Sequence, residues 1–205
     1  ESTANKFTLL ALPFISAIMN TVYIATSLDG YIADKNGGID WLSSIPNPEG
    51  SDFGFADFMN RIDALIMGRN TFETVLGFDV PWPYNKHVFV LSNSLTTIPE
   101  TVQDKATLVS GDLKDILTAI HVKGYKNLYI DGGKTIQSFL QENLVDEMII
   151  TTFPILLGGG TLLFRPMEKC IDFELVEGGT EVLLGQLVKH HYRKIVKQKT
   201  HVPGV

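Results

Sequence analysis

The stretch "NLYIDGGKTI", residues 127–136, decides the fold. Its apolar run at residues 128–130 has the length and composition typical of a buried β-strand. Gly132 and Gly133 follow directly, at the place where a helix is expected to begin. Glycines at such a junction let the backbone approach another group closely. The stretch therefore predicts a strand, a turn and a helix, and the turn is either ordinary turn chemistry or a site for the phosphates of a cofactor.

On both sides of this stretch, short β-rich runs alternate with helical patterns. This alternation is typical of a sheet with helices packed on its faces. We expect strands over residues 21–26, 63–68, 87–92, 106–110, 127–131 and 147–156. We expect helices over residues 53–62, 70–76, 112–121 and 135–142.

The pattern changes after Pro154, where apolar runs are separated by glycine turns instead of helices. Such runs predict hairpin strands. The fold class is therefore α/β, with a central mixed, mostly parallel sheet, helices on both faces and an antiparallel hairpin at the C-terminal end. The three consecutive glycines 158–160 are interpreted as a tight or bulged connection.

The length of 205 residues and the hydrophobic content of 44% predict a single domain, which we place at residues 19–198. Residues 199–205 form a tail. Residues 1–18 are expected to be a non-native or disordered extension. Their apolar stretch is too short to span a membrane and lacks a clear cleavage site, so a signal peptide is the second interpretation.

The net charge and the cysteine content of the chain restrict its partners and its compartment. A net charge of -6 without a basic cluster argues against a nucleic-acid partner, and no membrane span is expected. Cys170 is the single cysteine, so no internal disulfide can form, and no paired Cys and His spacing predicts a metal site. These features favour a reducing cytoplasm.

Three predicted strand-to-helix junctions share one design. Gly68 ends a strand and is followed by Arg69 and Thr71, "FVLSNSL" at residues 89–95 ends a strand with small polar residues, and "YIDGGKTI" repeats the glycine. In open α/β sheets ligands bind beyond the carboxyl ends of the strands, where helix N-termini offer free N–H groups to phosphates. We expect all three junctions at that edge.

The ordered set "TSLDGYIA", "IMGRNTFE", "VFVLSNS", "YIDGGKTIQSFL" and "LVDEMIITTFPILLGGGTLLF" resembles the dihydrofolate reductase-like superfamily. Within it, the chain is most similar to the RibD C-terminal domain family, the reductase domain of riboflavin biosynthesis. The resemblance covers about residues 21–196. It implies a dihydrofolate reductase-like three-layer fold, NADPH as the cofactor and a homodimer.

The resemblance also implies which residues bind NADPH. Arg69 matches the residue that pairs with the 2′-phosphate, and a guanidinium suits this role because its planar fork binds a phosphate with two hydrogen bonds. Asn93 stands where a hydroxyl or basic residue is common, which weakens the expectation of a 2′-phosphate preference. The implied cofactor-binding residues are Ala25, Gly68, Arg69, Thr71, Leu91, Ser92, Gly132, Gly133, Lys134, Thr135 and Ile136.

The resemblance says less about which residues bind and protonate the substrate. An acid on the first long helix assists protonation in the folate enzymes, and the spacing from Gly68 selects Asp52, with Asp57 as the competing candidate. Asp52 could equally be a helix N-cap. Thr151 matches the threonine that supports this acid, or it is an ordinary strand residue. The loop at residues 27–41 is either a lid over the nicotinamide or a surface loop.

The resemblance implies basic residues around the first long helix that hold a ribosyl phosphate in the riboflavin reductases. The stretch at residues 43–63 has Arg61 as its only basic residue, so an unphosphorylated or uncharged substrate is compatible with the chain. We expect an NADPH-dependent oxidoreductase that transfers hydride to a small heterocycle such as a pyrimidine or a pteridine, in the manner of 5-amino-6-(5-phosphoribosylamino)uracil reductase. The alternatives are a true dihydrofolate reductase and a non-catalytic NADP-binding regulatory protein.

Overall fold

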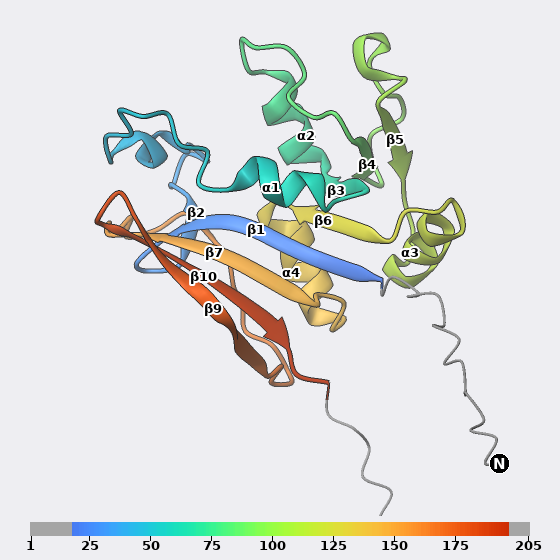
Figure 1. Cartoon of the computed structure of the whole chain (residues 1–205). Coiled ribbons are helices and arrows are strands. Elements are labelled where there is room, and N and C mark those ends of the chain that lie inside the picture. Colours follow the sequence, from blue (N-terminus) through green and yellow to red (C-terminus); the bar gives the residue numbers. More distant parts are fainter. Residues whose placement is uncertain (1–17, 197–205) are drawn as a thin grey trace, which may run out of the picture.

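The computed structural model describes residues 18–196 (Figure 1). The predicted tail at 199–205 and the predicted extension at 1–18, except its last residue, lie outside the described residues. An eight-stranded sheet runs in the order β5-β4-β3-β6-β1-β7-β10-β9. Its strands are β1 (Met19–Ser27), β3 (Ala64–Gly68), β4 (His87–Leu91), β5 (Ala106–Val109), β6 (Asn127–Asp131), β7 (Glu147–Phe153), β9 (Phe173–Leu183) and β10 (Leu187–Lys194).

The helices cover both faces of this sheet, which confirms the predicted three-layer α/β fold. Two hydrophobic cores lie on opposite faces. One contains residues of α1 (Phe55–Asn60) and α2 (Arg69–Leu76), and the other contains residues of α3 (Leu113–Val122) and α4 (Gly133–Gln141). We call the first face of the sheet the α1 side.

The strand directions also agree with the prediction. The pairs β1 with β6, β1 with β7, β3 with β4, β3 with β6 and β4 with β5 are parallel, whereas β10 is antiparallel to both β7 and β9. The C-terminal antiparallel hairpin is therefore β9 and β10. This hairpin extends the sheet beyond α1 (Figure 1), and much of β9 is exposed.

Local sequence patterns explain the helix positions. Leu113, Ile116, Leu117 and Ile120 recur at helical spacing and are all buried, and the side chain of Asp112 caps α3 by accepting hydrogen bonds from backbone N–H groups. The first helix, α1, is shorter than its predicted range because Phe53 and Gly54 adopt left-handed backbone angles, with φ of 57° and 87°. Two short 3-10 helices are η1 (Asp40–Ser43) and η2 (Glu100–Val102).

The loop at residues 27–41 is more ordered than the sequence indicated. Its middle forms β2 (Tyr31–Ala33), which pairs with β8 (Thr161–Leu162) in a separate two-stranded sheet. The carboxylate of Asp29 accepts hydrogen bonds from Ser27 Oγ at 2.6 Å and from the N–H of Gly158 at 2.8 Å. The three-glycine segment therefore anchors this loop. Strand β7, predicted over residues 147–156, ends at Phe153, before this segment.

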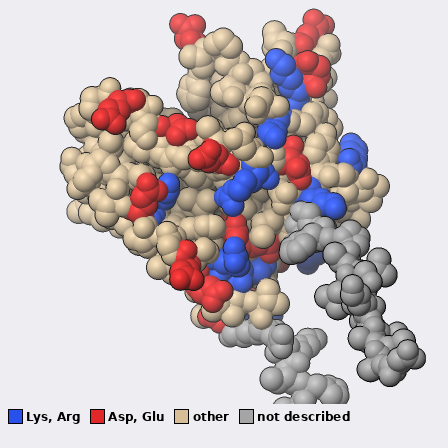
Figure 2. Space-filling view, viewed as in Figure 1, with Lys and Arg blue, Asp and Glu red and all other residues tan. Residues whose placement is uncertain are grey.

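Within residues 18–196, no helix has the length and apolar character needed to cross a membrane. The same residues contain no group of three or more His, Cys, Asp or Glu side chains placed to hold a metal ion. Basic and acidic side chains are interspersed on the face shown in Figure 2, without one extended basic surface.

Candidate functional site

The three predicted junctions lie side by side at one edge of the sheet. Strands β4, β3 and β6 are adjacent and parallel, so their carboxyl ends meet there. Gly68 is in register with Leu91, and Met67 with Asp131. We call this region the β4-β3-β6 edge. Since ligands of open α/β sheets bind beyond the carboxyl ends of strands, this edge is the first candidate for a ligand site.

Two glycines allow the junctions to interlock. A Cβ atom at Gly68 would lie 2.8 Å from Thr135 Oγ1, and a Cβ atom at Gly132 would collide with Thr71 Oγ1. Gly132 also has a φ of 88°, which favours glycine. Each glycine thus receives a threonine from the neighbouring junction. Gly68 and Gly132 therefore let the first turns of α2 and α4 pack against one another.

The first turns of α2 and α4 keep their backbone N–H groups available. Both helices have a glycine at the N-cap, Gly68 and Gly132, and neither cap makes a side-chain hydrogen bond to the helix. By contrast, Asp112 caps α3 through its own carboxylate. Free N–H groups and the positive end of the helix dipole favour an anion such as a phosphate.

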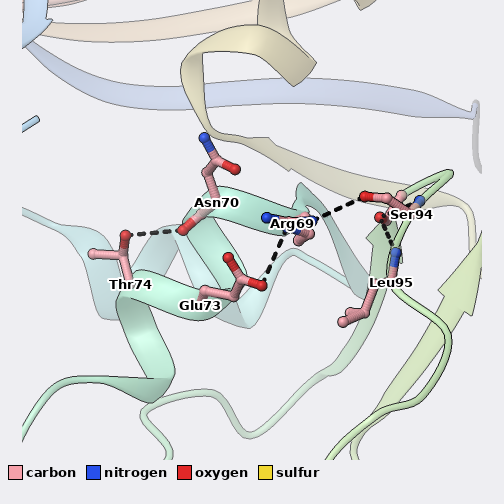
Figure 3. Close-up of polar contacts among 7 residues, drawn as sticks. Arg69, Asn70, Glu73, Thr74, Ser94 and Leu95 are labelled. Atoms are coloured by element: carbon pink, nitrogen blue, oxygen red, sulfur yellow. Dashed lines mark hydrogen bonds and ion pairs between the residues drawn. The ribbon is translucent and has the colours of Figure 1, made fainter.

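Arg69 supplies a cation at the same edge (Figure 3). Its Nη1 atom donates to Ser94 Oγ at 3.0 Å, and its Nε atom lies 3.2 Å from a carboxylate oxygen of Glu73. Ser92 Oγ in turn accepts a hydrogen bond from the N–H of Leu95 at 2.9 Å. The guanidinium therefore joins the start of α2 to the turn after β4 and stays largely exposed, with 43% of its side chain accessible.

The predicted nicotinamide and catalytic residues on the strands form a row on the α1 side. Ala25 of β1 pairs with Thr151 of β7, Thr151 with Lys189 of β10, and Lys189 with Glu181 of β9. Neighbouring strands lie about 4.8 Å apart, so the row spans about 15 Å. The sequence singled out Ala25 and Thr151 but missed Lys189 and Glu181, because only the register of the C-terminal hairpin brings them here.

Lys189 is largely buried under the turn that precedes α1. Its Nζ atom lies 2.7 Å from a carboxylate oxygen of Glu181 and donates to the carbonyl oxygen of Phe53 at 2.9 Å. The hydroxyl of Tyr23 donates to the same carbonyl at 2.9 Å. Burial, together with the nearby carboxylates of Asp52 and Glu181, raises the pKa of Tyr23 to about 12. Tyr23 therefore acts as a hydrogen-bond donor near neutral pH.

Asp52 accepts hydrogen bonds from backbone N–H groups at the start of α1. Its carboxylate accepts hydrogen bonds from the N–H groups of Gly54 at 2.9 Å and Ala56 at 2.8 Å, and the side chain is exposed. These hydrogen bonds lower the pKa of Asp52 and favour the ionised carboxylate. The N-cap position that the sequence left open for Asp52 is held by Gly54, and Asp52 binds the start of α1 from two residues before it. The competing candidate, Asp57, is exposed on α1.

Asp131 is an acid that sequence reasoning did not single out, although it lies in the opening stretch. It ends β6 beside the β4-β3-β6 edge, and its carboxylate accepts a hydrogen bond from the N–H of Gly132 at 2.8 Å. Burial raises its pKa, while its contacts with Gly132, Tyr129 and Tyr84 act in the opposite direction. The signal that could have found it is a carboxylate directly after a buried apolar strand, where desolvation is expected.

Aromatic side chains surround this acid on the α1 side. Tyr129 packs edge-on against Phe58 at 5.1 Å, and its hydroxyl donates to the carbonyl oxygen of Tyr23 at 3.0 Å. Tyr84 packs against Trp82 at 5.4 Å. Tyr129 and Phe58 are buried, so these rings form part of the core beneath Asp131.

The residues present fit a dinucleotide cofactor. The β4-β3-β6 edge brings together Gly68, Arg69, Thr71, Leu91, Ser92 and the whole segment 132–136, and Lys134 is exposed on the first turn of α4. Trp41 packs in the same hydrophobic cluster as Ala25, and its Nε1 atom is a buried donor without a partner among residues 18–196. Such donors are usually satisfied by water or by a ligand.

The chain resembles proteins of known sequence and structure over most of its length. The family model of the RibD C-terminal domain matches residues 20–184. The uncharacterized protein YwjB of Bacillus subtilis (strain 168) is 35% identical over 174 residues, which cover 83% of this chain and 95% of that protein.

Two solved structures share the fold. The crystal structure of a putative riboflavin biosynthesis protein from Shewanella sp. PV-4 is 53% identical, with a TM-score of 0.84 over 87% of this chain and 100% of that chain. The dihydrofolate reductase of Enterococcus faecalis, complexed with NADP(H), is 17% identical, with a TM-score of 0.59 over 86% of this chain and 96% of that chain. The second likeness shows a dihydrofolate reductase-like fold alone, whereas the family match covers most of the chain: this chain belongs to the RibD C-terminal domain family.

Proposed function

We propose that the protein is an NADPH-dependent reductase that transfers hydride to a small heterocycle such as a pyrimidine or a pteridine. One observation carries the proposal. At the β4-β3-β6 edge, two helix N-termini without side-chain caps lie together with the guanidinium of Arg69. A half-buried acid, Asp131, ends β6 beside them. Family membership supports the same reaction class.

The proposed roles of the cofactor-binding residues follow from their positions. The N–H groups in the first turns of α2 and α4 would bind the diphosphate, Arg69 the 2′-phosphate, and Leu91 and Ser92 the adenosine half. Ala25 would lie against the nicotinamide. NADPH supplies the hydride, and the protein contributes alignment and exclusion of water.

Two carboxyl groups are candidates for the proton that must accompany hydride transfer to a C=N bond. The pKa of Asp131 is raised by burial, which favours the protonated form that can donate. The pKa of Asp52 is lowered by its hydrogen bonds with the start of α1. We therefore propose Asp131 as the donor, supported by Tyr84 and Tyr129. Asp52 remains the alternative donor, with Thr151 as its supporting residue.

A second candidate function is binding of NADP without catalysis, in a regulatory protein. The exposed, ionised carboxylate of Asp52 favours it, because the acid expected from the folate enzymes is engaged elsewhere. This candidate predicts tight NADPH binding with no oxidation of the cofactor by any heterocycle. True dihydrofolate reduction predicts oxidation with dihydrofolate.

We also propose that the protein is a cytoplasmic homodimer. Leu28 and Leu156 are 61% and 70% exposed, and the hydrogen bond from Leu28 N–H to the carbonyl oxygen of Ile155, 2.8 Å, brings their segments together. Exposed apolar side chains that cluster in this way favour a subunit contact. Light scattering on the purified protein tests this proposal, and a monomer at micromolar concentration would contradict it.

The experiment that tests the proposed function is NADPH oxidation, followed by absorbance at the nicotinamide band. Dihydrofolate and 5-amino-6-(5-phosphoribosylamino)uracil are offered separately, together with its unphosphorylated riboside, and NADH serves as the cofactor control. Oxidation with a pyrimidine or a pteridine is expected. Saturable NADPH binding without oxidation in any mixture would instead support the non-catalytic candidate.

A further inference from the structure

Proteins bind a substrate phosphate with a free cation or with free backbone N–H groups, and among the described residues of the row around Ala25 and Thr151 both are already engaged. Lys189 is the cation in the row that contains Ala25 and Thr151. Its ammonium already lies 2.7 Å from Glu181 and 2.9 Å from the carbonyl oxygen of Phe53, and only 18% of its side chain is exposed. Two protein oxygens thus hold the positions a phosphate oxygen would take.

The backbone donors above this row are also engaged. The carboxylate of Asp52 accepts the N–H groups of Gly54 and Ala56 at the start of α1. These hydrogen bonds keep the carboxylate ionised, since they lower the pKa of Asp52. A phosphate approaching the turn at residues 52–54 would therefore meet a negative charge in place of free donors.

The other charged residues near this row are mostly acidic or are paired with an acid. Residues 38–60, which include η1 and α1, carry Asp40, Glu49, Asp52 and Asp57 and have no Lys, Arg or His. At the far end of β7, His191 and Arg193 lie 3.2 Å and 2.9 Å from the carboxylate of Glu147. Arg61, at the C-terminal end of α1, is exposed, lies over the ring of Phe58 at 5.8 Å and is not part of the row.

The helix N-termini and the cation at the β4-β3-β6 edge of the same chain differ from those on the α1 side. At this edge no side chain accepts a hydrogen bond from the first turns of α2 and α4, and Arg69, although paired with Glu73, keeps 43% of its side chain exposed. We infer that the substrate is an unphosphorylated, neutral or amine-bearing heterocycle, and that Glu181 is a specificity-determining residue that rejects phosphorylated analogues by occupying Lys189. This inference rests on the proposed function and specifies the substrate class of the same site.

The test compares two probes that differ only in a phosphate, 5-amino-6-(ribosylamino)uracil and its 5′-phosphate. NADPH oxidation is measured with each, and kcat/KM is compared. We expect the unphosphorylated compound to be preferred by roughly tenfold or more, the effect of one charged hydrogen bond that is either made or opposed. A preference of wild-type protein for the phosphorylated compound would overturn the inference while leaving the proposed reductase function intact.

Variants test the role assigned to Glu181. Glu181→Gln should raise kcat/KM for the phosphorylated compound by roughly tenfold, because Lys189 becomes available to the phosphate. The double variant Glu181→Gln with Lys189→Met should lose this gain. Glu177→Gln changes the same charge at an exposed position of β9 and should leave the preference unchanged. An unchanged preference in Glu181→Gln would contradict the role of Glu181.

The failure of the proposed function is a different result. If neither compound supports NADPH oxidation by wild-type protein or by Glu181→Gln, pyrimidine reduction itself is contradicted. Melting temperatures of all variants, measured with and without NADPH, show that the protein is folded and that the cofactor side is unchanged.

Discussion

Arg69 Nη1 donates a hydrogen bond to Ser94 Oγ across 3.0 Å, and this contact joins the start of α2 to the turn that follows β4 (Figure 3). A guanidinium has five N–H donors, so the contacts with Ser94 and Glu73 leave donors for a dianionic phosphate. Glu73, 3.2 Å from the Nε atom, orients the same side chain from the next turn of α2. The cation proposed to read the 2′-phosphate is therefore positioned before a ligand binds.

Arg69→Ala is expected to weaken NADPH binding by about 1.5–3 kcal/mol, roughly 10- to 150-fold in Kd, because a charged hydrogen bond to the 2′-phosphate is lost. NADH, which lacks this phosphate, should be affected little. Fluorescence titration of both cofactors measures the difference. Arg165→Ala, at an exposed arginine outside the edge, is the control. Equal losses for NADPH and NADH would exclude the assigned role.

Gly132→Ala should destabilise the protein by about 2–4 kcal/mol, because an L side chain is strained at a φ of 88° and its Cβ would collide with Thr71 Oγ1. Gly111→Ala is the matched control. Gly111 also has a positive φ, 116°, but a Cβ there meets no atom within 4 Å, so a loss of about 1 kcal/mol is expected. Denaturant unfolding measures both, and equal losses would show that the junctions do not interlock through Gly132.

Asp131→Asn should change the pH dependence of stability. Since burial raises the pKa of Asp131 in the folded protein, its favourable contribution is complete below the unfolded value and is lost as pH rises through the folded pKa. The variant should therefore gain stability relative to wild type from acid pH to pH 8, and its NADPH oxidation should be slower. Urea unfolding from pH 4 to pH 8 measures the gain. Asp57→Asn, at an exposed acid, is the control, and parallel pH curves for wild type and Asp131→Asn would contradict the burial of Asp131.

Asp52→Ala should lower the melting temperature at pH 7 by about 2–4 °C, the effect expected when the start of a helix loses its side-chain hydrogen bonds. The pKa of Asp52 is lowered in the folded protein, so its stabilising effect is present above the unfolded value and is lost as pH falls through the folded pKa. The difference between wild type and variant should shrink accordingly in acid. If Asp52→Asn keeps the melting temperature but abolishes NADPH oxidation, Asp52 is the proton donor instead of Asp131.

The sequence could predict the β4-β3-β6 edge because its signals are local. A buried strand, a glycine and the first helical turn are consecutive at Gly68 and at Gly132, and parallel strands bring such junctions to one edge. Helix α3 could be predicted as well, because Leu113 and Ile116 recur at helical spacing after the Asp112 cap. These features need no knowledge of which distant segments meet.

The α1 side depends on distant segments and was largely missed. Lys189 reaches the turn at Phe53 across 136 positions of sequence, and only the register of β10 against β7 places it beside Thr151. Asp52 had two interpretations, because an Asp before a helix is both a cap and a candidate acid. Strand β2 was missed because three residues are too few to show an alternating pattern.

The most direct test of the central claim is a titration of the purified protein with NADPH and with NADH, followed by the quenching of tryptophan fluorescence. We predict saturable binding of NADPH with one site per chain, and binding of NADH that is weaker by roughly tenfold or more, the contribution of one charged hydrogen bond to the 2′-phosphate. Absence of saturable NADPH binding, or equal affinity for the two cofactors, would contradict the assignment of the β4-β3-β6 edge as an NADPH site.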